Sequence, residues 1–470
     1  MNTSLKRPFF SRDKGMYKAF FIMTLSIALQ NLIVYGTNLA DNVMIGKWQT
    51  ILSGIALVNQ IQFLLQMAVN GVAEGMVVIA SRSWGRKDFE GIKNIISIGM
   101  RIALGVALIM WFFMFFFTKE VLGIITNEPA VIEEGVKYAK IVCFSYIFFA
   151  ITNVLTAAMR SVESVKPGIY VSVTALVVNV ILNYVFINGF WFIPQMKGVG
   201  AAIATLISRI VEMLVIICYV AFRDKKIKLR LRDFGRFDRA IFRVYLKVGS
   251  PCVISGTMWG FIQLAQTAIL GHLGEDVIAA NSIAATVFSI VTVAVYGSSS
   301  ASSVIIGKAL GEGKKHEIKG YTHSMQFMFV GIGLVTSLVL FSCKNLMVSF
   351  YTLTPEAADY TLTFIKILSV TVIGTSYQMS CLSGICRGGG DTTSIMINDF
   401  ISLVLIVLPL SYCAAFIWKL SPVIVFFFLK SDQLFKGIFA AIRTNSYKWI
   451  KDVGVNPVEE ALKKRELAGK

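Results

Sequence analysis

Charged residues are scarce in this chain. Lysine, arginine, aspartate and glutamate together make up 15% of its 470 residues, whereas hydrophobic residues make up 56%. An average soluble protein carries about 25% charged residues, and a chain of this length could not cover its surface with so few. The composition therefore argues against a soluble enzyme and predicts a protein embedded in a membrane.

Histidine and cysteine are also rare. The three histidines, His272, His316 and His323, lie at or near predicted loops and form no cluster. The seven cysteines are spread singly through apolar segments, and the closest pair, Cys381 and Cys386, lacks metal-ligand spacing. A membrane enzyme would need a cluster of histidine, aspartate or serine, and none is visible. We therefore expect neither an enzyme nor a cofactor.

What the chain has in abundance is apolar stretches of about 20 residues or more, the length needed to cross a hydrocarbon core of about 30 Å. The pattern predicts an all-α polytopic protein with twelve transmembrane helices. The expected spans are 17–45, 52–80, 94–117, 136–158, 168–189, 199–222, 249–271, 277–307, 322–343, 360–385, 394–418 and 421–443.

The positive charges are distributed unevenly over these spans. Most of the 45 lysines and arginines fall in the termini and in the loops on one face of the predicted membrane protein. Positive loops stay on the cytoplasmic side, so both termini are expected in the cytoplasm of a multi-pass protein of the plasma membrane. The net charge of +18 is then explained by membrane orientation and by attraction to the anionic headgroups of the lipid bilayer, so it requires no nucleic-acid partner.

An internal repeat divides the chain into two halves. Ile79 and Gly85 recur as Ile305 and Gly311, each 226 positions later, within the segments IASRSWGRKD and IIGKALGEGK. Two further echoes, NLADNVMIG with QLAQTAILG and AAMRSVESVKP with SGICRGGGDTT, keep nearly the same offset. Many secondary transporters are built from two copies of one multi-helix unit.

These observations predict five parts of the chain. Two six-helix bundles are joined by a basic segment along the inner membrane interface and flanked by cytoplasmic ends. The expected boundaries are 1–16 for the N-terminal segment, 17–222 for the first bundle, 223–248 for the linker, 249–443 for the second bundle and 444–470 for the tail.

The second span carries a continuous polar stripe. Asn59, Gln62, Gln66, Asn70 and Glu74 follow one another at steps of three or four residues, which places them on one helical face. Such a stripe suits an aqueous vestibule. Hydrogen bonding between helices is the alternative, but it needs only one or two amides, so the vestibule is favoured.

Few carboxylates lie within the spans, and they are candidates for ion coupling. Asp41 and Glu74 belong to the first and second spans, and Asp432 to the twelfth. An intramembrane carboxylate can carry a proton or, among other oxygens, hold a hard cation such as Na⁺. Asp432 lies four residues from Lys436, so it is either a structural ion pair or a mechanistic element.

Several segments together resemble the multidrug and toxic compound extrusion (MATE) transporters. ADNVMIG in the first span is similar to the family's first-helix signature. SRSWGRKD and GKALGEGKK are similar to its loop after the second and eighth helices, AMRSVESVKP and CRGGGDTT to its paired arginine loops, and KVGSPCV to the start of its seventh helix. The resemblance covers residues 17–443.

The resemblance implies two pseudo-symmetric six-helix bundles around a central cleft. Such a protein would be an antiporter that exports lipophilic, cationic drugs or metabolites in exchange for H⁺ or Na⁺. Asp41 matches the family's coupling aspartate, and Asn179 and Asn183 match a fifth-helix pair whose second position is often aspartate. The glutamate and aspartate that sodium-coupled members carry in the seventh and tenth helices have no counterpart here.

The site expectations follow from these residues. The ion-coupling candidates are Asp41, Glu74, Asn179, Asn183 and Asp432, with Na⁺ a candidate ligand at Asp41, Asn179 and Asn183. Polar and aromatic residues facing the cleft are expected to bind a small cationic substrate, and the protein is expected to act as a monomer. These substrate-binding candidates are Tyr35, Asn38, Gln66, Asn70, Trp259, Gln263, Asn281 and Tyr377.

A flippase for lipid-linked sugars or other lipids is the alternative within the wider superfamily. Such proteins share the two-bundle plan but line the cleft with several basic residues that bind phosphate. In this sequence the basic residues deep in the spans are Arg209, Lys430 and Lys436, which favours the antiporter. A receptor or scaffold fits the duplicated, polar-lined plan less well.

Overall fold

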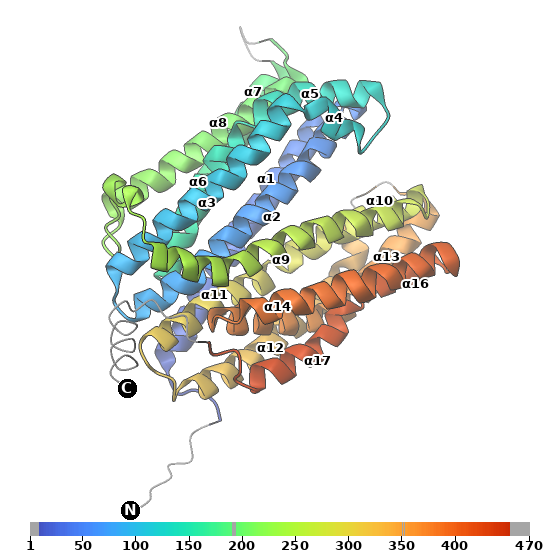
Figure 1. The fold of residues 1–470 in the computed structure, drawn as a ribbon. Helices are drawn as coiled ribbons and strands as arrows, with labels where there is room; N and C mark the ends of the chain where they lie inside the picture. Colours follow the sequence, from blue (N-terminus) through green and yellow to red (C-terminus); the bar gives the residue numbers. More distant parts are fainter. Residues whose placement is uncertain (1–8, 190–193, 350, 352, 452–470) are drawn as a thin grey trace, which may run out of the picture.

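The computed structural model describes residues 9–189, 194–349, 351 and 353–451. Within these ranges every regular element is helical, and the helices form two bundles (Figure 1). The N-terminal bundle is built from eight α-helices. They are α1 (Lys14–Ile45), α2 (Gln49–Gly85), α3 (Phe89–Phe116), α4 (Thr118–Gly123), α5 (Pro129–Val142), α6 (Ser145–Ser161), α7 (Lys166–Asn188) and α8 (Lys197–Cys218).

The π-helical turn η1 (Tyr219–Arg223) extends α8, and the linker between the bundles contains one short helical turn, η2 (Leu231–Gly235). The C-terminal bundle then begins, and several of its helices are interrupted by π-helical turns. Its elements are α9 (Arg239–Gly271), α10 (Glu275–Val291), α11 (Val293–Gly311), α12 (Ile318–Ser349), α13 (Pro355–Met379), η3 (Ser380–Cys386), α14 (Thr392–Asp399), η4 (Phe400–Val407), α15 (Leu408–Tyr412), η5 (Cys413–Ile417), α16 (Pro422–Lys430) and α17 (Asp432–Asn445).

Aspartates fix the starts of three long helices. Asp13 accepts hydrogen bonds from the first free amides of α1, and Asp88 and Asp238 do the same for α3 and α9. An N-cap side chain satisfies an amide that has no partner within the helix and adds about 1 kcal/mol of stability. The cap at Asp238 starts α9 ten residues before the expected seventh span, which begins at 249.

The helices are long and apolar enough to cross a membrane at most of the expected places. In the described part of the chain nine helices meet this test, and two bent pairs, α5 with α6 (52°) and α10 with α11 (46°), bring the count to eleven. The twelfth expected span, 421–443, corresponds to α16 and α17, which break at Ser431 and carry buried charges. The count of twelve therefore stays a prediction.

The two bundles meet at one end of the molecule and spread apart toward the other. In Figure 1 they lie together near the start of α9 and the end of α2, and they diverge toward α4 and α5 on one side and α10 and α16 on the other. We call these the closed end and the open end. The start of α1 and the end of α17 both lie at the closed end, as an even number of spans requires.

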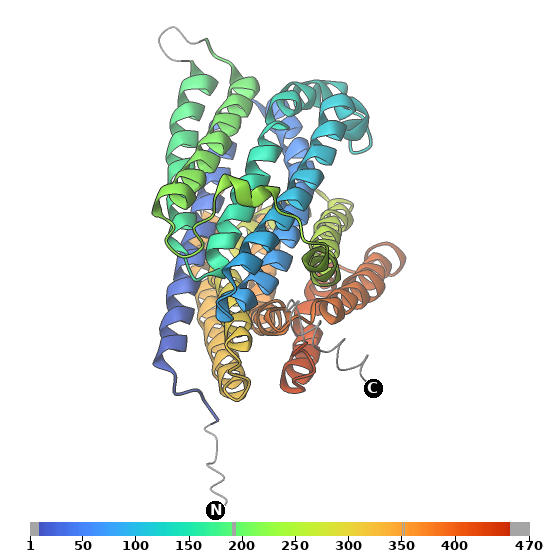
Figure 2. The same cartoon turned by 60° about the vertical axis from the view of Figure 1, so that its left-hand side comes forward.

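The helix α1 reaches across from one bundle to the other. Its first half runs beside α11 and α12 of the C-terminal bundle (Figure 2), and it packs extensively against α11. Phe20 in this half is fully buried and lies 6.2 Å, ring centre to ring centre, from Phe329 of α12. One hydrophobic core therefore continues from the N-terminal bundle into the C-terminal bundle at the closed end.

The repeated segments of the sequence touch each other at this end. A Cβ atom on Gly85, at the end of α2, would lie 2.2 Å from the carbonyl oxygen of Lys308 on α11. A Cβ atom on its repeat mate Gly311 would lie 2.1 Å from the carbonyl oxygen of Arg82. Only glycine allows this approach, so the repeat places two matching helix ends against each other across the interface between the bundles.

Candidate functional site

A polar cavity of about 270 Å³ lies inside the N-terminal bundle. It is enclosed by α1, α2, α5, α7 and α8, near the turn between α1 and α2 at the open end. Amides, hydroxyls and charged groups dominate its lining. The polar lining residues are Thr37, Asn38, Asp41, Asn42, Asn59, Gln62, Gln66, Tyr138, Asn179, Thr205, Ser208, Arg209 and Glu212.

Asp41 is held in this cavity by the two asparagines of α7. The Nδ2 atom of Asn183 donates one hydrogen bond to Oδ1 of Asp41 and another, of 3.0 Å, to Oδ1 of Asn179. Both asparagines are buried, with 0% and 3% of their surface exposed. The three predicted residues therefore come together as one cluster, because the four-residue spacing in α7 puts both amides on the face toward α1.

The Asp41 cluster offers oxygen atoms to a cation. The Oδ1 atom of Asn183 is buried and has no hydrogen-bond partner among the described residues. The carboxylate of Asp41 and Oδ1 of Asn179 are hard oxygen donors, which suit Na⁺ as well as a proton on Asp41.

Arg209 and Glu212 complete the charge of the cavity. On α8, Nη1 of Arg209 lies 3.0 and 2.8 Å from the two carboxylate oxygens of Glu212, and the guanidinium also lies over the ring of Phe149. Because this pair is neutral overall, the lining keeps the single formal negative charge of Asp41. A cavity of this size, polarity and charge is suited to a cation.

The polar stripe of α2 serves two purposes. Its first part, Asn59, Gln62 and Gln66, lines the cavity, as the vestibule interpretation expects. Asn70 instead accepts a 2.6 Å hydrogen bond from Nδ2 of Asn153 on α6. Three of the five stripe residues therefore form a cavity wall, and the next residue along the stripe joins two helices, as the alternative interpretation expects.

Glu74, further along the same stripe, lies between two arginines. Its Oε1 atom is 2.7 Å from Nη2 of Arg160 in its own bundle, and Oε2 is 3.9 Å from Nη1 of Arg387 in the other bundle. The two arginines belong to the repeated loops of the sequence. Glu74 therefore joins the bundles near the closed end, and it does not line the cavity.

The remaining substrate-binding candidates lie outside the lining of this cavity. Among them, Trp259 packs against Phe63 with ring centres 5.8 Å apart, and the hydroxyl of Tyr377 donates a 2.6 Å hydrogen bond to Gln326. The others are Tyr35, Gln263 and Asn281. Their role in binding stays a prediction.

Asp432 belongs to a separate buried cluster in the C-terminal bundle. Lys436, only 4% exposed, places its Nζ atom 3.0 Å from Asp399 and 3.7 Å from Asp432. Lys430, nearby on α16, donates a 3.0 Å hydrogen bond to Gln266, the repeat mate of Asp41. The sequence predicted Lys436 as a partner of Asp432. In the structure the Nζ atom of Lys436 lies closer to Asp399, which belongs to another helix, α14.

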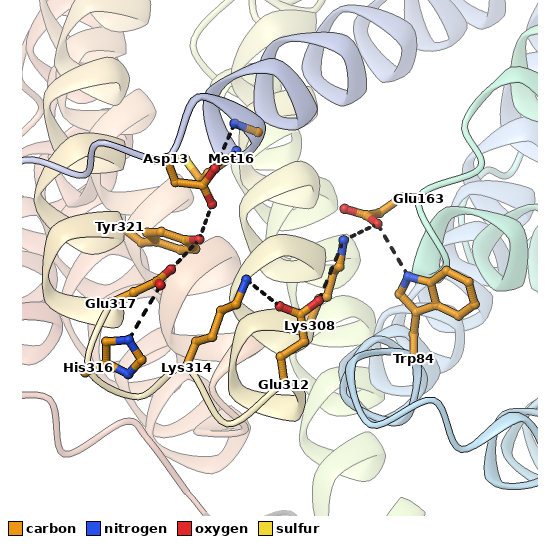
Figure 3. A network of polar contacts seen from close by, with 11 residues as sticks. Asp13, Met16, Trp84, Glu163, Lys308, Glu312, Lys314, His316, Glu317 and Tyr321 are labelled. Atoms are coloured by element: carbon orange, nitrogen blue, oxygen red, sulfur yellow. Dashed lines mark hydrogen bonds and ion pairs between the residues drawn. The ribbon is translucent and has the colours of Figure 1, made fainter.

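A network of ion pairs spans the closed end (Figure 3). The Nζ atom of Lys308 on α11 lies 2.6 Å from Oε2 of Glu163 in the loop between α6 and α7, which also accepts a 3.4 Å hydrogen bond from Trp84. Lys314 pairs with Glu312 at 2.9 Å, and this contact raises the pKa of Lys314. Sequence reasoning missed this site, although the repeat marked both Lys308 and its mate Arg82.

Arg82 makes the matching contact in the opposite direction. It donates hydrogen bonds from Nη2 to the carbonyl oxygen of Gly389 at 3.2 Å and from Nη1 to that of Lys451 at 2.8 Å. Gly389 occupies the place in the second repeat that Glu163 occupies in the first, since both pairs are separated by 226 positions. Two repeat-related cations therefore cross the interface reciprocally, one to a carboxylate and one to main-chain carbonyls.

The N-terminal segment is fastened to the same end. The hydroxyl of Tyr321 on α12 donates a 2.5 Å hydrogen bond to Oδ2 of Asp13, which holds the pKa of Asp13 below its usual value. The amide of Ser11 donates to Ser324 at 2.9 Å, and the ring of Phe9 stacks on His323. The start of α1 is thus bound to the C-terminal bundle.

Comparison with known proteins places this architecture. The family model MatE matches residues 26–185 and 251–413, which are the two halves of the repeat. The chain is 24% identical over 407 residues to a probable multidrug resistance protein NorM of Listeria monocytogenes (85% of this chain, 88% of that one). It is 23% identical over 427 residues to that of Thermotoga maritima (90% of each).

Solved structures share the fold. A MATE protein crystallised in a straight conformation matches with a TM-score of 0.82 at 18% identity, covering 92% of this chain and 96% of that one. A MOP superfamily transporter from Pyrococcus furiosus matches with a TM-score of 0.83 at 18% identity, covering 92% and 95%. The expected all-α, polytopic two-bundle fold is therefore confirmed, and the chain belongs to the multidrug and toxic compound extrusion (MATE) family.

Proposed function

We propose that the protein is a secondary active antiporter that exports lipophilic cations in exchange for H⁺ or Na⁺. Its curated relatives from Listeria and Thermotoga are named as probable multidrug resistance proteins, which supports a drug-like substrate. The Asp41 cluster inside a polar cavity carries the proposal, because it offers one negative charge and several oxygens in a space open to small molecules.

Competition for Asp41 would couple the two fluxes. A substrate cation and the coupling ion both gain from the same carboxylate, so binding of one weakens binding of the other. Either cation neutralises the Asp41 carboxylate, so the substrate-loaded form and the form that holds the coupling ion differ in which cation occupies the cavity. Asn179 and Asn183 would hold Asp41 in place and would supply oxygens for Na⁺ when the coupling ion is bound.

The two bundles would alternate by a rocking motion. The closed end is held by the contact between Gly85 and Gly311 and by the reciprocal contacts of Arg82 and Lys308. Access from that side requires all of them to separate, whereas the opposite end is already spread. Rigid-body movement of one repeat against the other is how duplicated transporters expose a site alternately.

Flux of the lipophilic cation ethidium into inverted membrane vesicles tests this proposal. H⁺ and Na⁺ gradients are imposed separately, and Asp41→Asn is compared with the wild type. We expect ethidium flux to fall by about tenfold or more in Asp41→Asn, because the attraction between two unit charges about 4 Å apart is roughly 1 kcal/mol in water and about 4 kcal/mol near a protein surface. Asp359→Asn, an exposed carboxylate outside the cavity, is the matched control and should retain flux.

Wild-type flux in Asp41→Asn under both gradients would remove Asp41 from the mechanism. Flux that responds to neither gradient in the wild type would contradict ion coupling altogether. The flippase alternative receives less support, because among the described lining residues Arg209 is the one basic group and Glu212 already neutralises it.

A further inference from the structure

A second cavity, of about 460 Å³, lies at the closed end, beside the network of Figure 3. Both bundles build this cavity. One side is formed by the first turns of α1, the loop between α6 and α7, and the linker. The other side is formed by the end of α11, the start of α12 and the loop between these two helices. Its walls carry four lysines and three carboxylates. They are Lys18, Lys226, Lys308, Lys314, Asp13, Glu163 and Glu312.

Two of the four lysines are already neutralised. Lys308 pairs with Glu163 at 2.6 Å, and Lys314 pairs with Glu312 at 2.9 Å. The third carboxylate, Asp13, accepts hydrogen bonds from the Tyr321 hydroxyl and from amides of its own helix. Outside these pairs stand Lys18 and Lys226, with two positive charges, and Asp13, with one negative charge, so the cavity keeps a net formal charge of +1.

Those two lysines have no carboxylate partner in the part of the chain that the structure describes. Nζ of Lys226 donates to the carbonyl oxygens of Val162 at 2.5 Å and Glu163 at 3.1 Å. Lys18 forms no ion pair or hydrogen bond with any described residue. Partial burial lowers the pKa of Lys226; the charge of Lys308 lowers it further, and two nearby carboxylates offset part of this effect. An anion beside Lys226 would offset the repulsion between its ammonium group and that of Lys308.

Apolar residues also line the cavity, and they continue onto the outer face of α1. Met16, Met23 and Ile305 lie inside it, and Ile22 lies at its edge with half of its surface exposed. From Lys18 and Ile22, Leu25 and Leu29 continue the same helical stripe at steps of three and four residues and are also exposed. In a membrane this stripe contacts acyl chains, so the cavity opens beside lipid.

We propose that this cavity binds the phosphate group of an anionic lipid headgroup, with Lys18 and Lys226 as its ligands and the lipid's acyl chains along the exposed stripe of α1. The loops at this end carry the excess of lysine and arginine expected to face the cytoplasmic leaflet, where anionic lipids are enriched. Because both bundles form the walls, a bound headgroup stabilises the state in which the closed end is closed. The inference is independent of the coupling ion and of Asp41.

Native mass spectrometry of the detergent-solubilised full-length protein tests the proposal. The protein is titrated with phosphatidylglycerol and, separately, with phosphatidylcholine carrying the same acyl chains. We expect the first phosphatidylglycerol to bind more tightly than phosphatidylcholine. Lys18→Gln with Lys226→Gln should weaken that step by roughly 25-fold, about fivefold for each lysine, and should leave phosphatidylcholine binding unchanged.

Lys225→Gln with Lys228→Gln is the matched control. These lysines lie in the same linker and are exposed, but they do not line the cavity, so this variant should keep the preference for phosphatidylglycerol. Lys18→Arg with Lys226→Arg preserves both charges and should also keep it, which separates charge from folding if the glutamine variant is unstable.

An equal loss of preference in the control variant would overturn the proposal, since it would assign the effect to the overall charge of this surface. Equal binding of both lipids to the wild type would also overturn it. If inorganic phosphate displaces phosphatidylglycerol at equal concentration, the proposal of a lipid ligand is wrong and the cavity binds a soluble anion. Failure of ethidium transport in Asp41→Asn has no bearing on any of these outcomes.

Discussion

The contact between Gly85 and Gly311 makes the closed end sensitive to a single methyl group. In Gly85→Ala the new Cβ would lie 2.2 Å from the carbonyl oxygen of Lys308, 2.9 Å from the amide nitrogen of Glu312 and 3.0 Å from Cα of Gly311. All three atoms belong to the main chain of the opposite bundle, so no side chain can turn away. Ordinary contact begins at 3.4 Å, and α11 must therefore move by about 1 Å away from α2.

The free-energy cost falls on one conformational state. Forcing an extra methyl group into a packed interface costs about 1–3 kcal/mol, but only while Gly85 and Gly311 face each other. In a state in which the bundles separate at this end the added methyl group contacts solvent and costs nothing. The equilibrium should therefore shift toward that state by about 5- to 150-fold.

Distances between spin labels across the closed end measure this shift. Labels at Arg86 and Lys315, both exposed and on opposite bundles, would be placed in a cysteine-depleted protein and read by pulsed electron resonance. We expect the wild type to populate mainly the short distance and Gly85→Ala to populate a longer one. Gly311→Ala should act in the same way, because its Cβ would lie 2.1 Å from the carbonyl of Arg82.

Gly331→Ala supplies the control, since a Cβ at that position of α12 meets nothing within 4 Å. It should leave the distances unchanged. A wild-type distance distribution in Gly85→Ala would refute the reasoning, whether or not the melting temperature falls, because it would show that the strain is absorbed within a bundle.

Three further perturbations probe other contacts, all read by thermal unfolding of the purified protein. In a double-mutant cycle, Lys308→Met and Glu163→Gln should show a coupling free energy of about 1 kcal/mol, the upper end of the range for exposed ion pairs, because this pair is partly buried. Additive effects would contradict the ion pair. Asp13→Ala should destabilise the protein by about 1–2 kcal/mol through the lost helix cap. Because the pKa of Asp13 is lowered below 3.8, this contribution is complete above that pH and is lost as the pH falls through the lowered value; a loss near pH 6 would exclude it. Lys436→Met should cost about 3–5 kcal/mol, because it removes the ammonium group between the buried Asp432 and the partly buried Asp399. Adding Asp399→Asn should restore part of this, and no restoration would contradict the pairing.

The sequence predicted the two-bundle plan because similar residues recur at a nearly constant offset, and such a repeat is visible without a structure. It could not show that Gly85 and Gly311 touch, since equivalent positions meet only if they lie close to the axis that relates the two bundles. The helix count shows a different limit. Hydropathy depends on composition, and the charges of Lys430, Asp432 and Lys436 lower it in a segment that is nonetheless helical and partly buried.

The candidate site was predicted where neighbours follow from one helix and a matching motif. The four-residue spacing of Asn179 and Asn183 placed both on one face, and the structure brings them to Asp41. Spacing could not tell which helix faces Asn70, so its bond to α6 was not foreseen. The pair of Glu163 and Lys308 lies 145 positions apart in the sequence, and nothing local in either segment points to the other.

The reciprocal contacts of Arg82 and Lys308 differ in which single substitutions would remove them. Lys308 depends on one carboxylate, so a single codon change at Glu163 abolishes its acceptor. Arg82 binds main-chain carbonyls, which every amino acid possesses, and Gly389 is fixed instead by space, since a Cβ there would lie 2.1 Å from the ring of Trp449. The Arg82 contact therefore depends on the space around the main chain of Gly389, whereas the Lys308 contact depends on the chemical identity of one side chain.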